Sequence, residues 1–479
     1  MTHAVRGFGL AATLVFVSTL AVIPQAKAQS AYVYMQSQGP AGPVYGYSAS
    51  SSGQLTAIPG SPFKPGTQII GSNKAQFFTL GKTLIHSYAV GSNGAIGSQL
   101  SSIGFLNYSG SACGGGTNGF ANGLLDHTGQ YFYVELQNGG DGSCAAYQTY
   151  KINTGGTFTF IGDTEKNLVV GESDSVDLPS ILGNESFGYA SEWIGHYSSL
   201  IGFQRESSGM LQLIQFGETD PTLSGSVYLS ANPDGAPSGN YAVVQLYPDN
   251  GGGDSNPPQL GSYTVDSKGN ISSTNTQSNM PTTAVSPVGS SFSPDGSLFA
   301  LNGEYGIEIY HFNGAAPLTL NTKLLNNTRV DQVAWDSSHH LYAYSSSTNK
   351  LYVFTVTSTS AIEDSSISVS SPWYMVVVSA AATTGGGCSA PASNGINVCS
   401  PANNATVTSP VQINAAATVS GGVYRFELWN GSTKLVSIDN SGIMDKSVSL
   451  APGTYHLTFD AYNSAKTTHE YATRDITVK

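Results

Sequence analysis

The sequence predicts an all-β protein in which a seven-bladed β-propeller is followed by an Ig-like β-sandwich. Three observations support this fold class: a low charge content with much glycine, a strand unit that recurs seven times, and an unpaired apolar run after the last unit. Only 10% of the 479 residues are charged, whereas 56 are Gly and 26 are Tyr. A composition with few helix-favouring charged residues and many Gly, Tyr, Val and Thr favours short strands joined by turns.

Residues 1–28 have the form of a secretory signal peptide. The apolar run FGLAATLVFVSTLAVI follows a single Arg and precedes Ala26-Lys27-Ala28, a small-x-small cleavage signal. The run has about 16 residues, whereas a membrane-spanning helix needs about 20, so an uncleaved anchor is the weaker alternative. We therefore expect a mature chain that begins near Gln29, lies outside the cytoplasm and has no transmembrane anchor.

Residues 31–380 contain the same sequence pattern seven times. An aromatic residue is followed by a turn and, eight positions on, by an apolar residue; the copies begin at Tyr47, Tyr88, Tyr150, Phe203, Tyr263, Tyr310 and Phe354. Five copies have glycine at the sixth position, where a hairpin turn can require a positive φ: Gly53, Gly94, Gly156, Gly209 and Gly269. Ala316 and Ser360 replace it in the last two copies, so we expect different turns there.

A second apolar run precedes each copy. The seven runs are YVYM (32–35), FFTL (77–80), YFYV (131–134), FGYA (187–190), YAVV (241–244), LFAL (298–301) and LYAY (341–344). Turn sequences such as SPDG (293–296) introduce several of them, so each unit contains four strands. Seven consecutive four-stranded units are typical of a β-propeller.

The first unit lacks a first strand of its own. The apolar run PWYMVVVSA (372–380) follows the seventh unit and belongs to no copy. We predict that Tyr374–Ser379 supplies the missing innermost strand of the first blade, because this closure leaves no exposed sheet edge.

The remainder of the chain is predicted to form a linker and a second domain. Residues 381–393 are rich in Gly, Ala and Ser, as in a flexible linker. In residues 394–479, the segment VYRFELWNGSTKLVSI (423–438) predicts a hairpin around an Asn-Gly turn. About seven short strands in this segment favour an antiparallel sandwich.

The blade pattern resembles the YVTN-type propellers related to the lactonase family, most closely in the passages 49–63 and 292–312. The tail is similar to the bacterial Ig-like domains of exported proteins. The lactonase resemblance implies lactone hydrolysis as an activity. However, lactonases that act on phosphorylated sugars need cationic anchors, and Arg205 and Arg329 are the only Arg residues between 30 and 420. No catalytic residue is therefore transferred from the family.

One residue directly follows the apolar run of each second strand, at the same position of the repeat, and most of these residues are polar. They are Gln36, Gly81, Glu135, Ser191, Gln245, Asn302 and Ser345. Together with nearby acids they give three candidate catalytic residues, Glu135, Glu192 and Glu304. Carboxylates that converge at a propeller rim can act as bases or hold a cation. The alternative interpretation is that strands become polar where they reach water. His339 and His340 are interpreted as exposed turn residues, and neither a cofactor nor a metal site is predicted.

Four cysteines form two local pairs, which in an exported chain predict the disulfides Cys113–Cys144 and Cys388–Cys399. The net charge of −12 argues against a nucleic-acid partner, because phosphate binding needs clustered Lys and Arg.

These features predict an exported, non-catalytic binding or adhesion protein, expected to act as a monomer. The propeller would recognise an extracellular glycan, polymer or protein surface, and the Ig-like domain would serve as a spacer or docking module. The alternative is a secreted lactonase-like or other hydrolase that uses the acidic rim.

Overall fold

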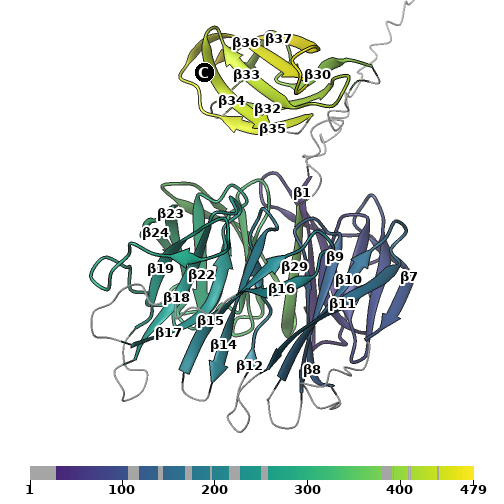
Figure 1. Ribbon diagram of the computed structural model, residues 1–479, viewed down its shortest axis with the longest axis vertical. Coiled ribbons are helices and arrows are strands. Elements are labelled where there is room, and N and C mark those ends of the chain that lie inside the picture. Colours follow the sequence, from purple (N-terminus) through teal and green to yellow (C-terminus); the bar gives the residue numbers. More distant parts are fainter. Residues whose placement is uncertain are drawn as a thin grey trace, which may run out of the picture.

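The computed structural model describes residues 29–105, 118–138, 144–167, 175–194, 197–214, 227–249, 257–379, 391, 393–407, 409, 411–439 and 442–479. Every regular element in these residues is a β-strand, β1 to β37 (Figure 1). Within the same residues, no helix is long and apolar enough to cross a membrane. The described chain is therefore all-β, as the composition predicted.

Seven separate sheets form the blades of a propeller, which confirms the predicted count. Strands are given from the first to the fourth of each blade. Blade one contains β29 (Pro372–Ser379), β1 (Gln29–Ser37), β2 (Val44–Ser50) and β3 (Leu55–Ala57), and blade two contains β4 (Gln68–Ser72), β5 (Gln76–Leu80), β6 (Leu84–Val90) and β7 (Ile96–Gly104). Blade three contains β8 (Asn118–Leu125), β9 (Tyr131–Asn138), β10 (Cys144–Ile152) and β11 (Phe158–Asn167), and blade four contains the split pair β12 (Ser175–Val176) and β13 (Ser180–Ile181) with β14 (Phe187–Ile194), β15 (Tyr197–Arg205) and β16 (Leu211–Ile214).

The last three blades have the same antiparallel order. Blade five contains β17 (Val227–Gly235), β18 (Tyr241–Asp249), β19 (Gln259–Val265) and β20 (Ile271–Ser272). Blade six contains β21 (Pro287–Phe292), β22 (Leu298–Gly303), β23 (Gly306–Asn313) and β24 (Ala316–Leu324), and blade seven contains β25 (Gln332–Trp335), β26 (His340–Ser345), β27 (Lys350–Val356) and β28 (Ala361–Ser368). The second strands β22 and β26 are buried along their whole length. Burial on both faces explains why these strands appear in the sequence as continuous apolar runs.

The ring closes as predicted. β29 pairs antiparallel with β1, from Ala31 opposite Ser379 to Gln36 opposite Tyr374, and the strand begins two residues earlier than expected, at Pro372. The Oγ atom of Ser379 also accepts a hydrogen bond of 3.0 Å from the backbone N–H of Ser337 in the seventh blade. The C-terminal strand of the propeller therefore completes the first blade.

The first strand of each blade lies innermost. These strands contact one another in the order β13, β17, β21, β25, β29, β4 and β8. The strands run between two faces of the propeller (Figure 1). We call the face with the turns between first and second strands the turn face, and the opposite face, where second strands lead into third strands and each blade leads into the next, the loop face.

A hydrogen bond from the preceding blade holds the turn between the third and fourth strands at every junction. Tyrosine hydroxyls donate at three junctions: from Tyr34 to the Gly94 carbonyl (2.7 Å), from Tyr133 to Gly209 (2.8 Å) and from Tyr189 to Gly269 (2.7 Å). Ser87, Ser262 and Ser365 donate to Gly156, Gly314 and Gly53. The Asn321 amide donates to the Thr357 carbonyl at the remaining junction (3.0 Å).

Glycine is required in these turns for two reasons. All five predicted glycines have positive φ, for example +80° at Gly94 and +91° at Gly209. A Cβ atom on Gly209 would also lie 2.1 Å from the Tyr131 ring of the preceding blade. In the sixth blade the positive φ falls on Gly314 instead of Ala316, so the expected difference in turn is confirmed.

The C-terminal domain is a sandwich of two sheets. One contains β30 (Gly395–Ser400), β32 (Val411–Thr418) and β35 (Ile443–Val448); the other contains β31 (Ala405–Val407), β37 (His469–Val478), β36 (Gly453–Tyr462), β33 (Arg425–Asn430) and β34 (Thr433–Asp439). These eight strands exceed the expected seven. Phe426, Leu428 and Phe459 lie in the core between the sheets. The predicted Asn-Gly hairpin joins β33 to β34, with Gly431 at φ +57°.

Candidate functional site

The polar residues at the ends of the second strands are buried instead of forming an open rim. Six of them have at most 1% of their surface exposed: Gln36, Glu135, Ser191, Gln245, Asn302 and Ser345. A buried polar group is costly unless it is hydrogen-bonded, so the partners of these side chains decide their role.

Three of these side chains bind the backbone of the next blade. The Gln36 amide accepts a hydrogen bond from the N–H of Ile69 (3.1 Å) and donates to the carbonyl of Thr67 (3.0 Å). Ser191 Oγ accepts from the N–H of Asn232 (2.8 Å). Asn302 Nδ2 donates to the carbonyl of residue 330 (2.9 Å). These buried polar side chains therefore join neighbouring blades.

The three candidate glutamates occupy different environments. Glu135 is 1% exposed in β9, and its Oε2 accepts a hydrogen bond of 3.2 Å from Asn122 Nδ2 in the same blade. Glu192 lies in β14 opposite Ser199, and its side chain is outside the described residues. Glu304 lies on the loop face of the sixth blade with 39% of its side chain exposed. The structure thus separates a buried Glu135 from an exposed Glu304.

Glu304 is part of a charged group that sequence reasoning did not identify. Its carboxylate pairs with Arg329 Nη1, and Arg329 Nε donates to Asp331 Oδ1 at 2.7 Å. The other oxygen of Asp331 accepts a hydrogen bond of 2.6 Å from the N–H of Ser346. Hydrogen bonding to Asp331 raises the pKa of Arg329. The guanidinium of Arg329 is therefore held between two carboxylates, and the whole side chain is 44% exposed.

Two exposed aromatic residues lie on the same face of the propeller as this group. Tyr305 follows Glu304 directly and is 59% exposed, and Trp373 at the start of β29 is 51% exposed. They are the most exposed aromatic side chains among the described residues of the propeller. The Trp373 carbonyl accepts a hydrogen bond of 2.6 Å from Tyr344, and the charges of Asp331 and Arg329 act on Tyr344.

These residues lie at the loop-face ends of blades six, seven and one. We use the name loop-face patch for Glu304, Tyr305, Arg329, Asp331 and Trp373. Its members lie in turns and connections that differ between blades, which explains why the repeat pattern gave no signal for them.

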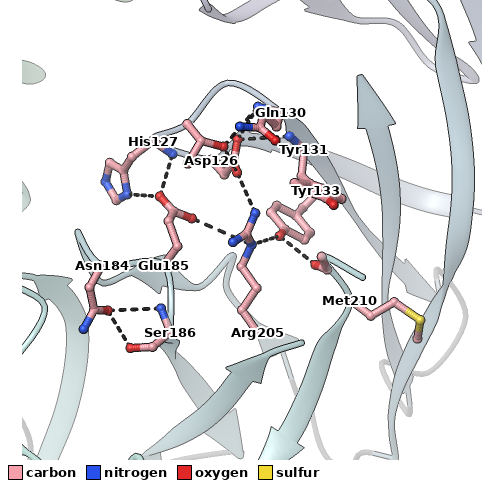
Figure 2. A network of polar contacts seen from close by, with 12 residues as sticks. Asp126, His127, Gln130, Tyr131, Tyr133, Asn184, Glu185, Ser186, Arg205 and Met210 are labelled. Atoms are coloured by element: carbon pink, nitrogen blue, oxygen red, sulfur yellow. Dashed lines mark hydrogen bonds and ion pairs between the residues drawn. The ribbon is translucent and has the colours of Figure 1, made fainter. Parts of the chain in front are cut away.

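The turn face carries a second polar network, between blades three and four. Figure 2 shows the Arg205 guanidinium among Asp126, Tyr133 and Glu185. Arg205 Nη2 lies 2.9 Å from Asp126 Oδ2, its Nε donates to the Tyr133 hydroxyl at 3.0 Å, and its Cζ lies 4.7 Å from the Tyr131 ring centroid. The Arg205 side chain is 13% exposed and Asp126 is fully buried. This network joins the two blades.

A histidine at the edge of this network is partly open to solvent. His127 donates its backbone N–H to Glu185 Oε1 at 3.0 Å, and its Nδ1 lies 2.9 Å from the same oxygen (Figure 2). The hydrogen bond to Glu185 raises the pKa of His127.

Asp234, in the first strand of blade five, has an unusual environment. Its Oδ1 accepts a hydrogen bond from Ser180 Oγ (3.3 Å), whereas Oδ2 is buried and has no partner among the described residues. Burial raises the pKa of Asp234 to about 6, and hydrogen bonding offsets only part of this effect. The carboxyl group therefore ionises at a higher pH than an ordinary aspartate.

The interpretation of the paired histidines is correct for one residue only. His339 lies in its turn at φ +62°, with 40% of its side chain exposed. His340 is wrongly predicted: it is 2% exposed, and its Nδ1 lies 2.9 Å from the buried Asp336. Burial opposes the charged imidazole, but hydrogen bonding and the charge of Asp336 outweigh it and raise the pKa of His340. The histidine belongs to the packing of blade seven.

The predicted disulfides stay predictions. Cys399 in β30 is disulfide-bonded, but Cys388 and Cys113 lie outside the described residues, as does the side chain of Cys144. In the described part of the chain, no three His, Cys, Asp or Glu side chains are grouped so that they could hold a metal ion.

Comparison with solved structures identifies the propeller fold. A periplasmic gluconolactonase from Pseudomonas aeruginosa is 10% identical with a TM-score of 0.52, and the alignment covers 73% of this chain and 99% of that protein. A candidate 6-phosphogluconolactonase from Bacteroides fragilis is 12% identical with a TM-score of 0.51, covering 74% and 99%. A protein from Lactobacillus plantarum is 12% identical with a TM-score of 0.50, covering 73% and 99%.

Sequence comparison adds information on the tail. Residues 395–472 match the family model of the bacterial Ig domain. No curated protein matches the chain. At identities of 10–12% the structural likeness shows the fold alone. The chain therefore combines a seven-bladed propeller, with the fold of these lactonase-like proteins, and a C-terminal bacterial Ig domain.

Proposed function

We propose that this chain is an exported binding protein that recognises an extracellular polymer or surface through the loop-face patch. The observation that carries the proposal is the patch itself, which combines two exposed aromatic side chains with a guanidinium held between two carboxylates. Exposed aromatic side chains with polar neighbours are typical of recognition surfaces, because large rigid rings give contact area at a low entropic cost. The signal peptide predicted for residues 1–28 supports export, and the Ig-like domain would serve as a spacer or docking module.

The rigidity of the propeller supports a binding role. Backbone hydrogen bonds hold two residues of the patch in place. The N–H of Tyr305 donates to the carbonyl of Val285 (3.1 Å), and the N–H of Asp331 donates to the carbonyl of Tyr344 (3.0 Å). A surface fixed in this way loses little conformational entropy when it binds.

A secreted lactonase-like hydrolase is the second candidate. Its support is the likeness of the propeller to proteins named as gluconolactonases, one of them periplasmic. Glu135 and Glu304 are the described carboxylates available for this role. Against it, Glu135 is almost completely buried and Glu304 is paired with Arg329.

A screen of the mature protein against immobilised glycans, other polymers and protein-coated surfaces, run beside a lactone hydrolysis assay, separates the two candidates. We expect saturable binding without turnover, and binding that weakens in Arg329→Ala. Turnover that is abolished by Glu135→Gln or Glu304→Gln would favour the hydrolase and contradict our proposal.

A further inference from the structure

We infer that the loop-face patch binds uncharged sugar units of an extracellular glycan. This inference rests on the proposed function and specifies the ligand class of the same site. It follows from the hydrogen-bonding groups of the patch, the two aromatic rings and the sign of the local charge.

The charged centre of the patch is suited to vicinal hydroxyl groups. The contacts of Arg329 with Glu304 and Asp331 use two of its five N–H groups. The Arg329 side chain is 44% exposed and the Glu304 side chain is 39% exposed, so solvent reaches both groups. A hydroxyl group both donates and accepts a hydrogen bond, so two adjacent hydroxyls can bind the guanidinium and a carboxylate at once. These contacts are charge-assisted and therefore strong.

The aromatic rings supply the apolar part of the same recognition. A pyranose ring carries C–H groups on its faces and hydroxyls around its edge, so it can stack on an aromatic ring while its edge binds polar groups. Tyr305 adjoins Glu304 in sequence. The backbone carbonyl of Trp373 accepts a hydrogen bond from the Tyr344 hydroxyl, and the carbonyl of Tyr344 accepts one from the N–H of Asp331. The two rings thus belong to blades six and one, and a glycan chain of several sugar units is the ligand that would engage both.

Charge distinguishes a neutral glycan from the main alternatives. Two carboxylates and one guanidinium leave the patch with a net negative charge, and the whole chain carries −12. Uronate or sulfate groups would therefore be repelled over the Debye length, about 8–10 Å at physiological ionic strength. A stable protein interface needs roughly 800 Å² from each partner, with an apolar centre. In the patch the apolar contribution comes from two separate rings.

The test measures binding of the intact mature protein to two soluble probes of matched length, a neutral glucan and a polyuronate, by calorimetry at low and physiological salt. We expect the neutral glucan to bind and the polyuronate not to bind at either salt concentration. Trp373→Ala and Tyr305→Ala should each weaken glucan binding on the order of tenfold. Trp373→Phe keeps a ring at this position and should restore most of the affinity.

Matched controls separate the patch from general effects. Tyr471→Ala removes an aromatic side chain that is 62% exposed in the Ig-like domain and should leave binding unchanged. Arg329→Lys keeps the charge but loses the planar fork, and should weaken binding as Arg329→Ala does.

Three results would overturn the inference. If the polyuronate or a protein surface binds and Trp373→Ala weakens that binding, the ligand class is wrong although the proposed function stands. If the glucan binds with undiminished affinity to both aromatic variants, the patch is not its site. If the wild-type protein binds no probe in the wider screen, the proposed function and this inference both fail.

Discussion

The ionisation of Asp234 should make the propeller less stable as the pH rises. Its Oδ2 is buried without a partner among the described residues, and its pKa is raised by burial from 3.8 to about 6. A carboxyl group with a raised pKa in the folded state stabilises the fold below its unfolded value. This contribution is lost as the pH rises from the unfolded value to the folded one. The substitution Asp234→Asn removes the charge and keeps the shape.

The size of the effect follows from the two pKa values. The interval from 3.8 to about 6, at about 1.4 kcal/mol per pKa unit, corresponds to about 3 kcal/mol of lost stability above pH 6.5. We expect Asp234→Asn to be more stable than the wild type at pH 8, and to lose most of this advantage by pH 4. The side-chain amide introduced by Asp234→Asn needs a hydrogen-bond acceptor, so the gain in folding stability at pH 8 is smaller than about 3 kcal/mol.

The assay is chemical denaturation of both proteins from pH 4 to pH 8, followed by a signal of the propeller. Asp266→Asn is the matched control, because Asp266 is an exposed turn residue whose pKa is lowered by hydrogen bonds from Asn270. Its substitution should cause no gain in stability at high pH. A stability difference between wild type and Asp234→Asn that stays constant from pH 4 to pH 8 would refute the reasoning.

The other predictions concern closure, turns and disulfides. A chain that ends at residue 371 lacks β29 and should melt far below one that ends at residue 384, because β1 loses its ladder partner; equal melting temperatures would mean that the ring closes without this strand. Gly209→Ala should destabilise the propeller more than Gly155→Ala. Both residues have positive φ, which costs about 1–2 kcal/mol on substitution, but only Gly209 also faces an aromatic ring. Equal losses of stability in urea denaturation would contradict this prediction. Non-reducing peptide mapping should show a Cys388–Cys399 peptide, and a crossed pair would exclude the assignment.

The fold was predictable from sequence because the repeat pattern reflects contacts between blades. The aromatic residue that begins a second strand packs on the glycine turn of the next blade, as Tyr131 does on Gly209 and Tyr32 on Gly94. These contacts recur at successive junctions, so they leave the same residues at the same spacing. The closing strand was predictable because the first unit lacked one strand and the last had one in excess.

The candidate site could not be predicted in the same way. Glu135 and Glu304 both follow the apolar run of a second strand, but Glu135 is buried within β9, whereas Glu304 lies beyond the end of β22 and pairs with Arg329. The sequence distance of 25 residues between Glu304 and Arg329 gives no sign of this contact. The burial of His340 likewise depends on Asp336, four residues earlier in the same turn.

The closure of the ring by β29 also has a mechanical consequence. Trp373 lies at the loop-face end of this strand, and Ser379, from which the chain continues to the Ig-like domain, lies at the turn-face end. A ligand held at the patch and an anchorage through the Ig-like domain would therefore pull along the axis of β29. Such tension loads the ladder between β29 and β1 in shear, so its hydrogen bonds resist together and do not open one after another. The strand that completes the first blade would then also be the element that transmits force through the propeller.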